Sequence, residues 1–345
     1  MDNLSEIIQP RKYGYFFFVI KQINILLLFL KIYVYDVFLI LKNLRKDVIK
    51  YNLSSISIIY YAIIKYPLIG FRPSNFFMYK LHKNNYKHYL TFFEGTSKVA
   101  RKNKHFPYLL DNKLKFKIVI KDKINTPELV AFFNYKNKKI SNFLNSQTEK
   151  IVIKPVKGYG GKGFKIINSH EMSENFKNCY KDYLAENYII QHSFFNDIFS
   201  DSVNTLRILT IKKNNDIEIL NIILKVGQKS TKNIDNIGQG GICINVNLET
   251  GYLGKGYTFY EYGHNEFIHH PDTGFNFYNK TIPFFKEAKE QAIKAHKLFS
   301  KFTIIGWDIA ITENGPIMIE GNRIPDLSLH QIHFPLKKKL IDFIN

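Results

Sequence analysis

Cysteine is scarce in this chain of 345 residues, which contains only Cys179 and Cys243. They form no CxxC pair and no Cys/His spacing typical of zinc ligands, so the sequence predicts neither a disulfide framework nor a structural zinc site. Such usage favours a reducing cytoplasm. No small-residue cleavage site follows the apolar N-terminal region, which argues against a secretory signal peptide.

Acidic residues are also few. The chain contains 29 Asp and Glu but 49 Lys and Arg, which gives a formal net charge of +20. An excess of this size suits phosphate-rich ligands, nucleic acid or an anionic membrane surface. The frequent Lys, Ile and Asn residues are equally typical of an AT-rich genome, so the charge alone selects no partner. The sequence has no cluster of aromatic and basic residues typical of nucleic-acid binding, and we expect no nucleic-acid partner.

Glycine and proline are missing between Gly14 and Pro67, a segment rich in Ile, Leu, Phe and Tyr. This pattern predicts helical hairpins or a small helical bundle. Lys21, Lys31 and Asp36 interrupt the apolar run, and a central charge in a bilayer span costs roughly 3 kcal/mol, so a transmembrane span is disfavoured. The helices could pack on the rest of the protein or lie on a membrane surface, and both alternatives stay open.

The rest of the chain alternates helical and β-rich segments, which predicts an α+β fold. A proline and glycine cluster, Pro67 to Pro73, marks a boundary, and we expect a helical region over residues 1–95 and an α+β domain over residues 96–345. The expected helices are one that begins at Asn112, Ile140–Leu144 and Pro283–Phe299. The expected strands are one entered through Pro127, Ile151–Val156, Phe164–Ile167, Ile189–Gln191, Thr205–Ile211, Ile217–Lys225, Gly241–Asn245, and the pair Gly306–Thr312 and Pro316–Glu320, joined by the turn Glu313-Asn314-Gly315.

A glycine-rich loop formally contains G-x-G-x-x-G at Gly158, Gly160 and Gly163. A dinucleotide-binding loop requires a following helix, a Walker A loop requires Lys followed by Ser or Thr, and protein kinases carry His-Arg-Asp and Asp-Phe-Gly motifs; none of these conditions is met. The pattern predicts instead a hairpin whose tip amides approach phosphate oxygens, with Lys154 as a fixed positive charge. An ordinary glycine-rich hairpin is the alternative. The loop residues expected to bind a nucleotide are Gly158, Tyr159, Gly160, Gly161, Lys162 and Gly163.

A second constellation lies in the final predicted hairpin. If its strands pair through the Asn314-Gly315 turn, Asp308 comes opposite the end of the strand that holds Glu320, and Glu320 and Asn322 lie on one face. Mg2+ prefers oxygen ligands, and two carboxylates and an amide suit it. The acidic residues lie among Ile, Ala and Met, where an unpaired charge is costly, so we expect a metal site rather than two solvated side chains.

With the loop and the acidic cluster in this order, residues 109–331 resemble the ATP-grasp superfamily, and more narrowly its members associated with cell-surface sugar transfer. The resemblance implies a fold of two α+β subdomains that clamp ATP, here preceded by the helical N-terminal region. Lys113 in Asp-Asn-Lys-Leu and Lys154 in Ile-Lys-Pro look like the two phosphate lysines of the superfamily. Asp308, Glu320 and Asn322 look like its D…E-x-N metal set, which implies ATP and one or two Mg2+ ions as cofactors. The segment similar to the nucleotide hinge contributes Glu186, Asn187, Tyr188 and Ile189.

The narrower resemblance rests on Ser202–Ile208, on Gly240-Gly241 before Asn245, and on the run that begins at Glu320. Arg207 lies within a strand run, and an arginine there suits a carboxylate or acyl-phosphate, so Arg207 and Lys154 are the expected catalytic residues. The acidic ribose ligand of many relatives has no certain counterpart, with Asp197 and Asp201 as candidates. The N-terminal third also departs from the usual pre-ATP domain.

The resemblance implies an ATP-dependent carboxylate-amine ligase that acts through an acyl-phosphate. Its expected substrates are a carboxylate in a surface polysaccharide precursor, of a capsule or an O-antigen in the cell envelope, and an amino acid or amino sugar as the amine. The alternatives are a sugar or alcohol phosphotransferase on the same fold, and a non-catalytic basic membrane-surface protein. We expect a cytoplasmic protein with weak peripheral contact with the anionic inner face of the membrane.

Overall fold

The computed structural model describes residues 15–103, 107–143, 148–158, 160–231 and 234–344. By its internal contacts the chain divides into two compact units. Unit 1 comprises Met1–Phe106, Tyr257–Glu266 and Ile324–Asn345, and unit 2 comprises Pro107–Gly256 and Phe267–Arg323. The proposed domain boundary near residue 95 stays a prediction.

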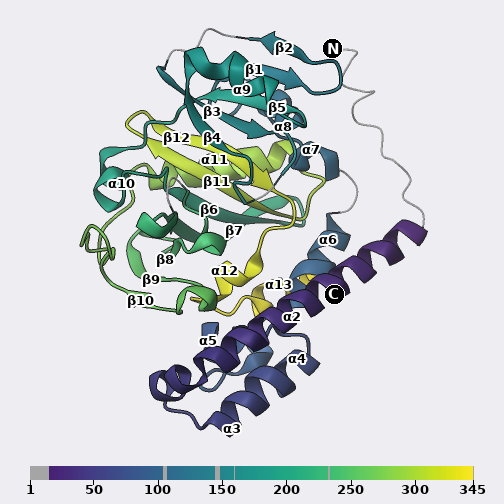
Figure 1. Ribbon diagram of the computed structural model, residues 1–345, viewed down its shortest axis with the longest axis vertical. Coiled ribbons are helices and arrows are strands. Elements are labelled where there is room, and N and C mark those ends of the chain that lie inside the picture. Colours follow the sequence, from purple (N-terminus) through teal and green to yellow (C-terminus); the bar gives the residue numbers. More distant parts are fainter. Residues whose placement is uncertain (1–14, 104–106, 144–147, 159, 232–233, 345) are drawn as a thin grey trace. The chain divides into compact units, whose positions relative to one another are not determined.

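Unit 1 is mainly helical, as predicted for the N-terminal region (Figure 1). Helix α2 (Tyr15–Tyr51) is followed by a second helical stretch, and the hydroxyl of Tyr33 donates to the carbonyl of Ile63 at 3.1 Å between the two. The N-terminal third therefore forms a hairpin of one long helix and a shorter return. The other helices of unit 1 are α3 (Ser55–Ile58), η1 (Ile59–Lys65), α4 (Tyr66–Leu68), α5 (Asn75–Met78), η2 (Tyr86–His88), η3 (Glu94–Lys98), α6 (Val99–Lys102), η7 (Tyr260–Tyr262), α12 (Leu327–Gln331) and α13 (Lys337–Ile344).

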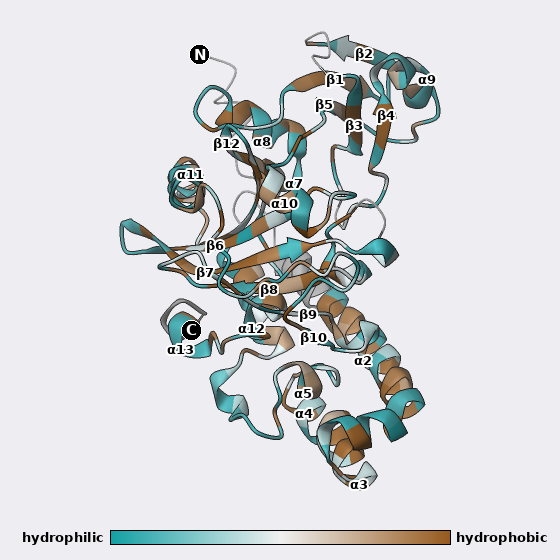
Figure 2. Ribbon diagram, turned by 90° about the vertical axis from the view of Figure 1, so that its left-hand side faces the viewer, coloured by the Kyte–Doolittle hydropathy of each residue, from teal (hydrophilic) through white to brown (hydrophobic). Residues whose placement is uncertain are grey.

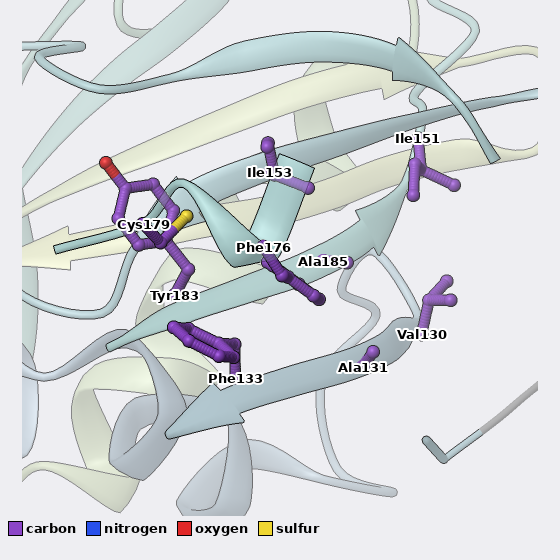
Figure 3. Packing of buried hydrophobic residues seen from close by; sticks show 9 residues of the cluster. All are labelled: Val130, Ala131, Phe133, Ile151, Ile153, Phe176, Cys179, Tyr183 and Ala185. Atoms are coloured by element: carbon purple, nitrogen blue, oxygen red, sulfur yellow. The ribbon is translucent and has the colours of Figure 1, made fainter. Parts of the chain in front are cut away.

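Unit 2 contains a five-stranded sheet with the order β2-β1-β5-β3-β4 and antiparallel pairing. Its core is formed by apolar side chains of β1, β3 and β5 together with Phe176 of α9 (Figure 3). The rings of Phe133 and Phe176 stack with centroids 5.5 Å apart. The elements are α7 (Pro107–Asp111), α8 (Lys113–Ile120), β1 (Leu129–Asn134), β2 (Lys139–Asn142), β3 (Lys150–Pro155), β4 (Lys165–Asn168), η4 (Ser169–Glu171), α9 (Met172–Lys177) and β5 (Tyr183–Asn187).

The second sheet has seven strands in the order β10-β9-β8-β7-β6-β11-β12. Helix α11 packs over its strands β6, β7, β11 and β12. The final hairpin forms as predicted, with Asp308 opposite Glu320, but Thr312 pairs with Gly315, so the two turn residues are Glu313 and Asn314. Gly315 has φ +106°, which an L side chain rarely adopts and which suits the tight turn. The elements are α10 (Ser193–Ile198), β6 (Thr205–Lys213), β7 (Asp216–Val226), η5 (Lys229–Thr231), η6 (Ile237–Gln239), β8 (Ile242–Val246), β9 (Leu253–Tyr257), β10 (Glu266–Phe267), α11 (Phe285–Leu298), β11 (Ile304–Thr312) and β12 (Gly315–Asn322).

A buried hydrogen-bonded chain joins α11 to the seven-stranded sheet. The Nε1 of Trp307 donates to Oγ1 of Thr210 at 2.8 Å, and this hydroxyl lies 2.7 Å from Nδ1 of His296. The Nε2 of His296 lies 3.0 Å from the carbonyl oxygen of Phe302, to which it donates. Burial lowers the pKa of His296 to about 4, so the ring is neutral at pH 7.

Two predicted elements are wrong. The predicted helix Ile140–Leu144 is instead strand β2, which pairs with β1 from Ala131↔Asn142 to Asn134↔Lys139; Leu144 itself lies outside the described residues. Hairpin pairing with β1 overrides the weak helical pattern of this short segment. The predicted strand Ile189–Gln191 is also wrong, because the strand is β5, which ends at Asn187, and Ile190 is 70% exposed.

Candidate active site

A buried ion cluster lies across three neighbouring strands of the seven-stranded sheet. Arg207 of β6 is the register partner of Asp308 of β11. The guanidinium binds the carboxylate with two hydrogen bonds, Nε to Oδ1 at 2.6 Å and Nη2 to Oδ2 at 2.8 Å. The Nζ of Lys225, on β7, lies 3.4 Å from the same Oδ1. Burial opposes ionisation of Asp308, but the two cations outweigh it and hold the pKa of this carboxyl well below its usual range.

A second carboxylate extends this cluster. The Nζ of Lys225 lies 3.4 Å from Oδ2 of Asp235, and the hydroxyl of Thr205 also donates to this carboxylate. Burial raises the pKa of Asp235 in spite of the nearby lysine. Neither Lys225 nor Asp235 was predicted as a site residue. The sequence signal that could have identified Lys225 is its position near the end of the apolar run Ile217–Val226. A charged side chain in such a run is buried in the sheet and therefore requires a charged partner.

The other two predicted metal ligands lie at the end of β12. The amide of Asn322 donates to Oε1 of Glu320 at 3.4 Å, and the Nζ of Lys113 lies 3.5 Å from Oε2 of Glu320. The pairing of β11 with β12 shifts by one residue just after Asp308, which is typical of a β-bulge and re-aims side chains beside it. The predicted set Asp308, Glu320 and Asn322 is therefore gathered at one end of one hairpin.

The donor chemistry of this hairpin fits a hard cation. Two carboxylates and an amide supply oxygens, the ligands that Mg2+ prefers, and Glu320 is only partly buried. Among the described residues, no group of three His, Cys, Asp or Glu side chains could hold a metal ion by itself. A site here consequently depends on the amide of Asn322 and on oxygens of a bound substrate, which is how proteins commonly hold Mg2+.

The predicted hinge residue Glu186 forms a buried triad with two lysines in the five-stranded sheet. Its Oε1 lies 2.8 Å from Nζ of Lys117 on α8, and its Oε2 lies 2.6 Å from Nζ of Lys154 on β3. Burial opposes ionisation of Glu186, but the lysines keep the pKa of its carboxyl below the usual value. Burial also lowers the pKa of Lys117. The structure thus brings together two residues predicted for nucleotide binding and adds Lys117, which the sequence analysis missed.

The glycine-rich hairpin tip is bound by the connection between strands β7 and β8. The carbonyl of Gly160 accepts hydrogen bonds from Asn236 at 3.2 Å and from Gln239 at 2.8 Å. Gly163 has φ +81°, and a Cβ there would lie 2.8 Å from the hydroxyl of Tyr183, so a larger residue requires a rearrangement. The amine of Lys113 donates to the carbonyl of Gly158 at 2.9 Å and thereby links the hairpin to Glu320.

The remaining predicted residues occupy varied positions. The backbone N–H of Asn187 donates to the carbonyl of Glu128 at 3.0 Å, and the N–H of Tyr188 to the carbonyl of Lys150 at 3.4 Å. Ile189 follows directly, beyond the end of β5. Gly161 and Lys162 are exposed, Tyr159 lies outside the described residues, and the ribose candidates Asp197 and Asp201 are both exposed. Their roles in nucleotide binding stay predictions.

With this geometry established, sequence comparison identifies the family. The family described as "Sugar-transfer associated ATP-grasp" matches residues 97–182 and 179–340. The chain belongs to this family. The two antiparallel sheets of unit 2 and the helical N-terminal region are accordingly those of an ATP-grasp protein with a helical extension. No curated protein matches the chain in sequence.

Several solved structures are similar to this ATP-grasp chain. L-amino acid ligase from Bacillus licheniformis matches with a TM-score of 0.42 and 14% identity, over 72% of this chain and 46% of that chain. D-alanine-D-alanine ligase from Helicobacter pylori matches with a TM-score of 0.39 and 17% identity, over 68% of this chain and 58% of that chain. N5-carboxyaminoimidazole synthetase from Staphylococcus aureus, complexed with ADP, matches with a TM-score of 0.40 and 16% identity, over 66% of this chain and 51% of that chain. The chain spans about half the length of these structures.

Proposed function

We propose that this ATP-grasp protein is an ATP-dependent carboxylate-amine ligase that acts through an acyl-phosphate. The observation that carries the proposal is the buried cluster of Arg207, Lys225 and Asp308 beside Glu320. Cations and acidic metal ligands side by side suit a reaction in which a phosphoryl group is transferred and its charge must be neutralised. Membership of the sugar-transfer associated family supports a carboxylate in a surface polysaccharide precursor, of a capsule or an O-antigen, as the acceptor.

In the proposed reaction, a carboxylate oxygen of the substrate attacks the γ-phosphorus of ATP and releases ADP. The amine then attacks the acyl carbon, forms the amide and releases phosphate and a proton. Lys113 and Lys154 would bind phosphate oxygens, and Arg207, whose Nε and Nη2 bind Asp308, would orient the acyl-phosphate through its other N–H groups. Asp308, Glu320 and Asn322 would hold Mg2+, which when bound neutralises phosphate charge.

Oxygen labelling tests this proposal directly. The protein is incubated with ATP, Mg2+, amino acids or amino sugars as amines, and uronic-acid sugar precursors whose carboxylates carry 18O. Mass spectrometry should detect an amide, ADP, and inorganic phosphate that contains one 18O atom, because the attacked phosphoryl group keeps the carboxylate oxygen. ADP with a phosphorylated sugar or alcohol and no amide would instead support a phosphotransferase. An amide product together with unlabelled phosphate would contradict the proposed acyl-phosphate intermediate.

For its location, we propose the cytoplasm, at the inner face of the membrane, where ATP and polysaccharide precursors meet. This part of the proposal rests on family membership and on the formal net charge of +20, which suits an anionic surface. Fractionation of cells that express the full chain tests it. An exclusively soluble protein would contradict the membrane location.

A further inference from the structure

One face of α2 exposes a continuous stripe of large apolar side chains. They recur at intervals of three or four residues, which places them on one side of the helix over about 27 Å. Val34 is 66% exposed and Phe38 is 61% exposed. Leu28 and Tyr35 are also exposed and widen the stripe, and the exposed Lys31 lies within the widened band, where its long side chain can extend to the headgroups. The stripe consists of Ile23, Leu27, Leu30, Val34, Phe38 and Leu41.

The opposite face of α2 is fixed to unit 1. Ile25, Phe29 and Ile40 are buried there. Asp36, fully buried, accepts from Arg72 at 3.0 Å and 3.3 Å, and Asp47 accepts from the hydroxyl of Tyr260. Protein thus covers one side of the helix over most of its length.

The return stretch of the helical hairpin repeats the pattern. Ile56, Tyr60, Ile64 and Leu68 are spaced four residues apart and exposed, Leu68 by 82%. Helix-period exposure of this kind on both members of a hairpin is unusual for a surface bathed in water alone. Figure 2 shows the hydrophobic residues in brown on α2 and α3.

Positive charge continues the stripe at its C-terminal end. Lys42, Arg45 and Lys46 directly follow Leu41, and all three side chains are exposed. A helix with an apolar face, exposed tyrosines and adjacent basic residues is typical of proteins that lie in the interface of an anionic bilayer. Tyrosine, with an apolar ring and a polar hydroxyl, suits the headgroup level.

We propose that the helical hairpin Ile23–Leu68 inserts its exposed apolar face into one leaflet of an anionic bilayer, as a monotopic anchor. Ile23–Tyr51 is the one described helix long and apolar enough to cross a membrane, which by itself is weak evidence. A span would place Asp36 near the middle of the hydrocarbon and would strip it from Arg72, at a high cost. The fixed inner face therefore leaves only the outer face for lipid. A coiled-coil seam with a second copy would be narrower than the stripe widened by Leu28 and Tyr35.

The anchor differs in one measurable respect from purely electrostatic attachment. Apolar burial is insensitive to salt, whereas attraction between the basic residues and headgroups is screened. The full chain is co-sedimented with vesicles of phosphatidylglycerol and phosphatidylethanolamine at about 0.1 M and about 1 M salt. We expect binding at both, weakened but not abolished at high salt, and weaker binding to phosphatidylcholine vesicles.

Two variants and a matched control separate the contributions. The stripe variant Leu27→Ser, Val34→Ser, Phe38→Ser should lower the partition coefficient at least about tenfold at both salt concentrations. The charge variant Lys42→Gln, Arg45→Gln, Lys46→Gln should lower the partition coefficient about a hundredfold at low salt and much less at high salt. The control Tyr252→Ser, Ile268→Ser, Tyr278→Ser removes three exposed apolar side chains of unit 2 and should bind as the parent does. Circular dichroism melting checks that each variant folds.

Specific outcomes would overturn the anchor. These are no binding by the parent chain, unchanged binding by a folded stripe variant, or complete loss of parent binding at high salt. A dimer that the stripe variant converts to a monomer, without vesicle binding by the parent, would assign the stripe to a second copy. None of these readouts depends on ligase activity, so the anchor and the proposed reaction can fail separately.

Discussion

Arg207 and Asp308 face each other on neighbouring strands β6 and β11, and the guanidinium contacts both carboxylate oxygens at 2.6 Å and 2.8 Å. The pair is buried, and Lys225 lies on the same carboxylate. A single acidic residue thus receives two cations while it lies in register with Glu320. Removal of either cation alters both the stability of the sheet and the charge available at the site.

Substitution of Arg207 should separate these two effects. Arg207→Met leaves Asp308 with Lys225 alone and should lower the free energy of unfolding by on the order of 3 kcal/mol, because a buried carboxylate loses its bidentate partner. Arg207→Lys keeps the charge without the fork and should cost less stability, yet it should lower turnover at least about a hundredfold. Urea unfolding measures the free energy of unfolding, and ADP release measures turnover. Equal stability of Arg207→Met and the parent would contradict the structural part of this prediction.

Glu186→Gln should destabilise the protein strongly. The substitution leaves Lys117 and Lys154 buried without their shared anion, which should cost about 3 to 5 kcal/mol of unfolding free energy. The double variant Glu186→Gln, Lys117→Met removes one of the two cations and should recover part of the loss. Urea unfolding of the single and double variants provides the measurement, and no recovery in the double variant would show that the triad is not coupled.

Lys154→Ala should lower ATP affinity about tenfold or more while the protein still folds, because Glu186 keeps Lys117 as its partner. The matched control is Lys165→Ala, an exposed lysine on the paired strand β4. Isothermal titration with ATP measures affinity. Unchanged affinity in Lys154→Ala would remove this lysine from phosphate binding.

Glu320→Gln should leave folding nearly intact and abolish turnover, because the amide lacks the charge that Mg2+ requires. Glu218→Gln, at an exposed position of β7, is the control for loss of one negative charge. The measurement combines ADP release with electron paramagnetic resonance of Mn2+ binding in the presence of ATP. Full activity, or undiminished Mn2+ binding, would exclude Glu320 from the metal site.

Acidification should destabilise the fold through His296. Its pKa in the folded state is about 4, below the ordinary value of 6.5, so the unfolded chain binds a proton more readily. The stability contribution is therefore complete above pH 6.5 and is lost progressively as the pH falls toward 4, by on the order of 2 to 3 kcal/mol. His296→Gln should flatten this part of the curve of unfolding free energy against pH. An equally steep decline in His296→Gln would assign the effect to other groups.

Local signals made the hairpins of unit 2 predictable. Runs of β-branched residues and the Asn314-Gly315 turn define β11 and β12, and the glycine-rich loop defines the turn between β3 and β4. The turn places Asp308 near the Glu320 end of the hairpin, whereas the exact pairing of the two residues depends on the β-bulge just after Asp308, which no local pattern specifies. Their proximity is thus a property of one contiguous segment.

Non-local pairing could not be predicted in the same way. Lys225 reaches Asp308 only because β6 lies between β7 and β11. Lys117 and Glu186 are far apart in sequence, and no local pattern specifies that α8 meets β5. A single sequence shows that a buried charge needs a partner but does not name the partner.

The composition of unit 1 from separate stretches has a consequence for its synthesis. The N–H of Leu90 donates to the side chain of Gln331 at 2.6 Å, and Glu94 pairs with Lys337 at 2.7 Å. A ribosome releases the first partner of each pair long before it makes the second, and domains generally fold as units during translation. Unit 1 can therefore close only after the segment from Gln331 to Lys337 has been synthesised. Until then the residues around Leu90 and Glu94 lack the hydrogen bond and the ion pair that join them to the later segment.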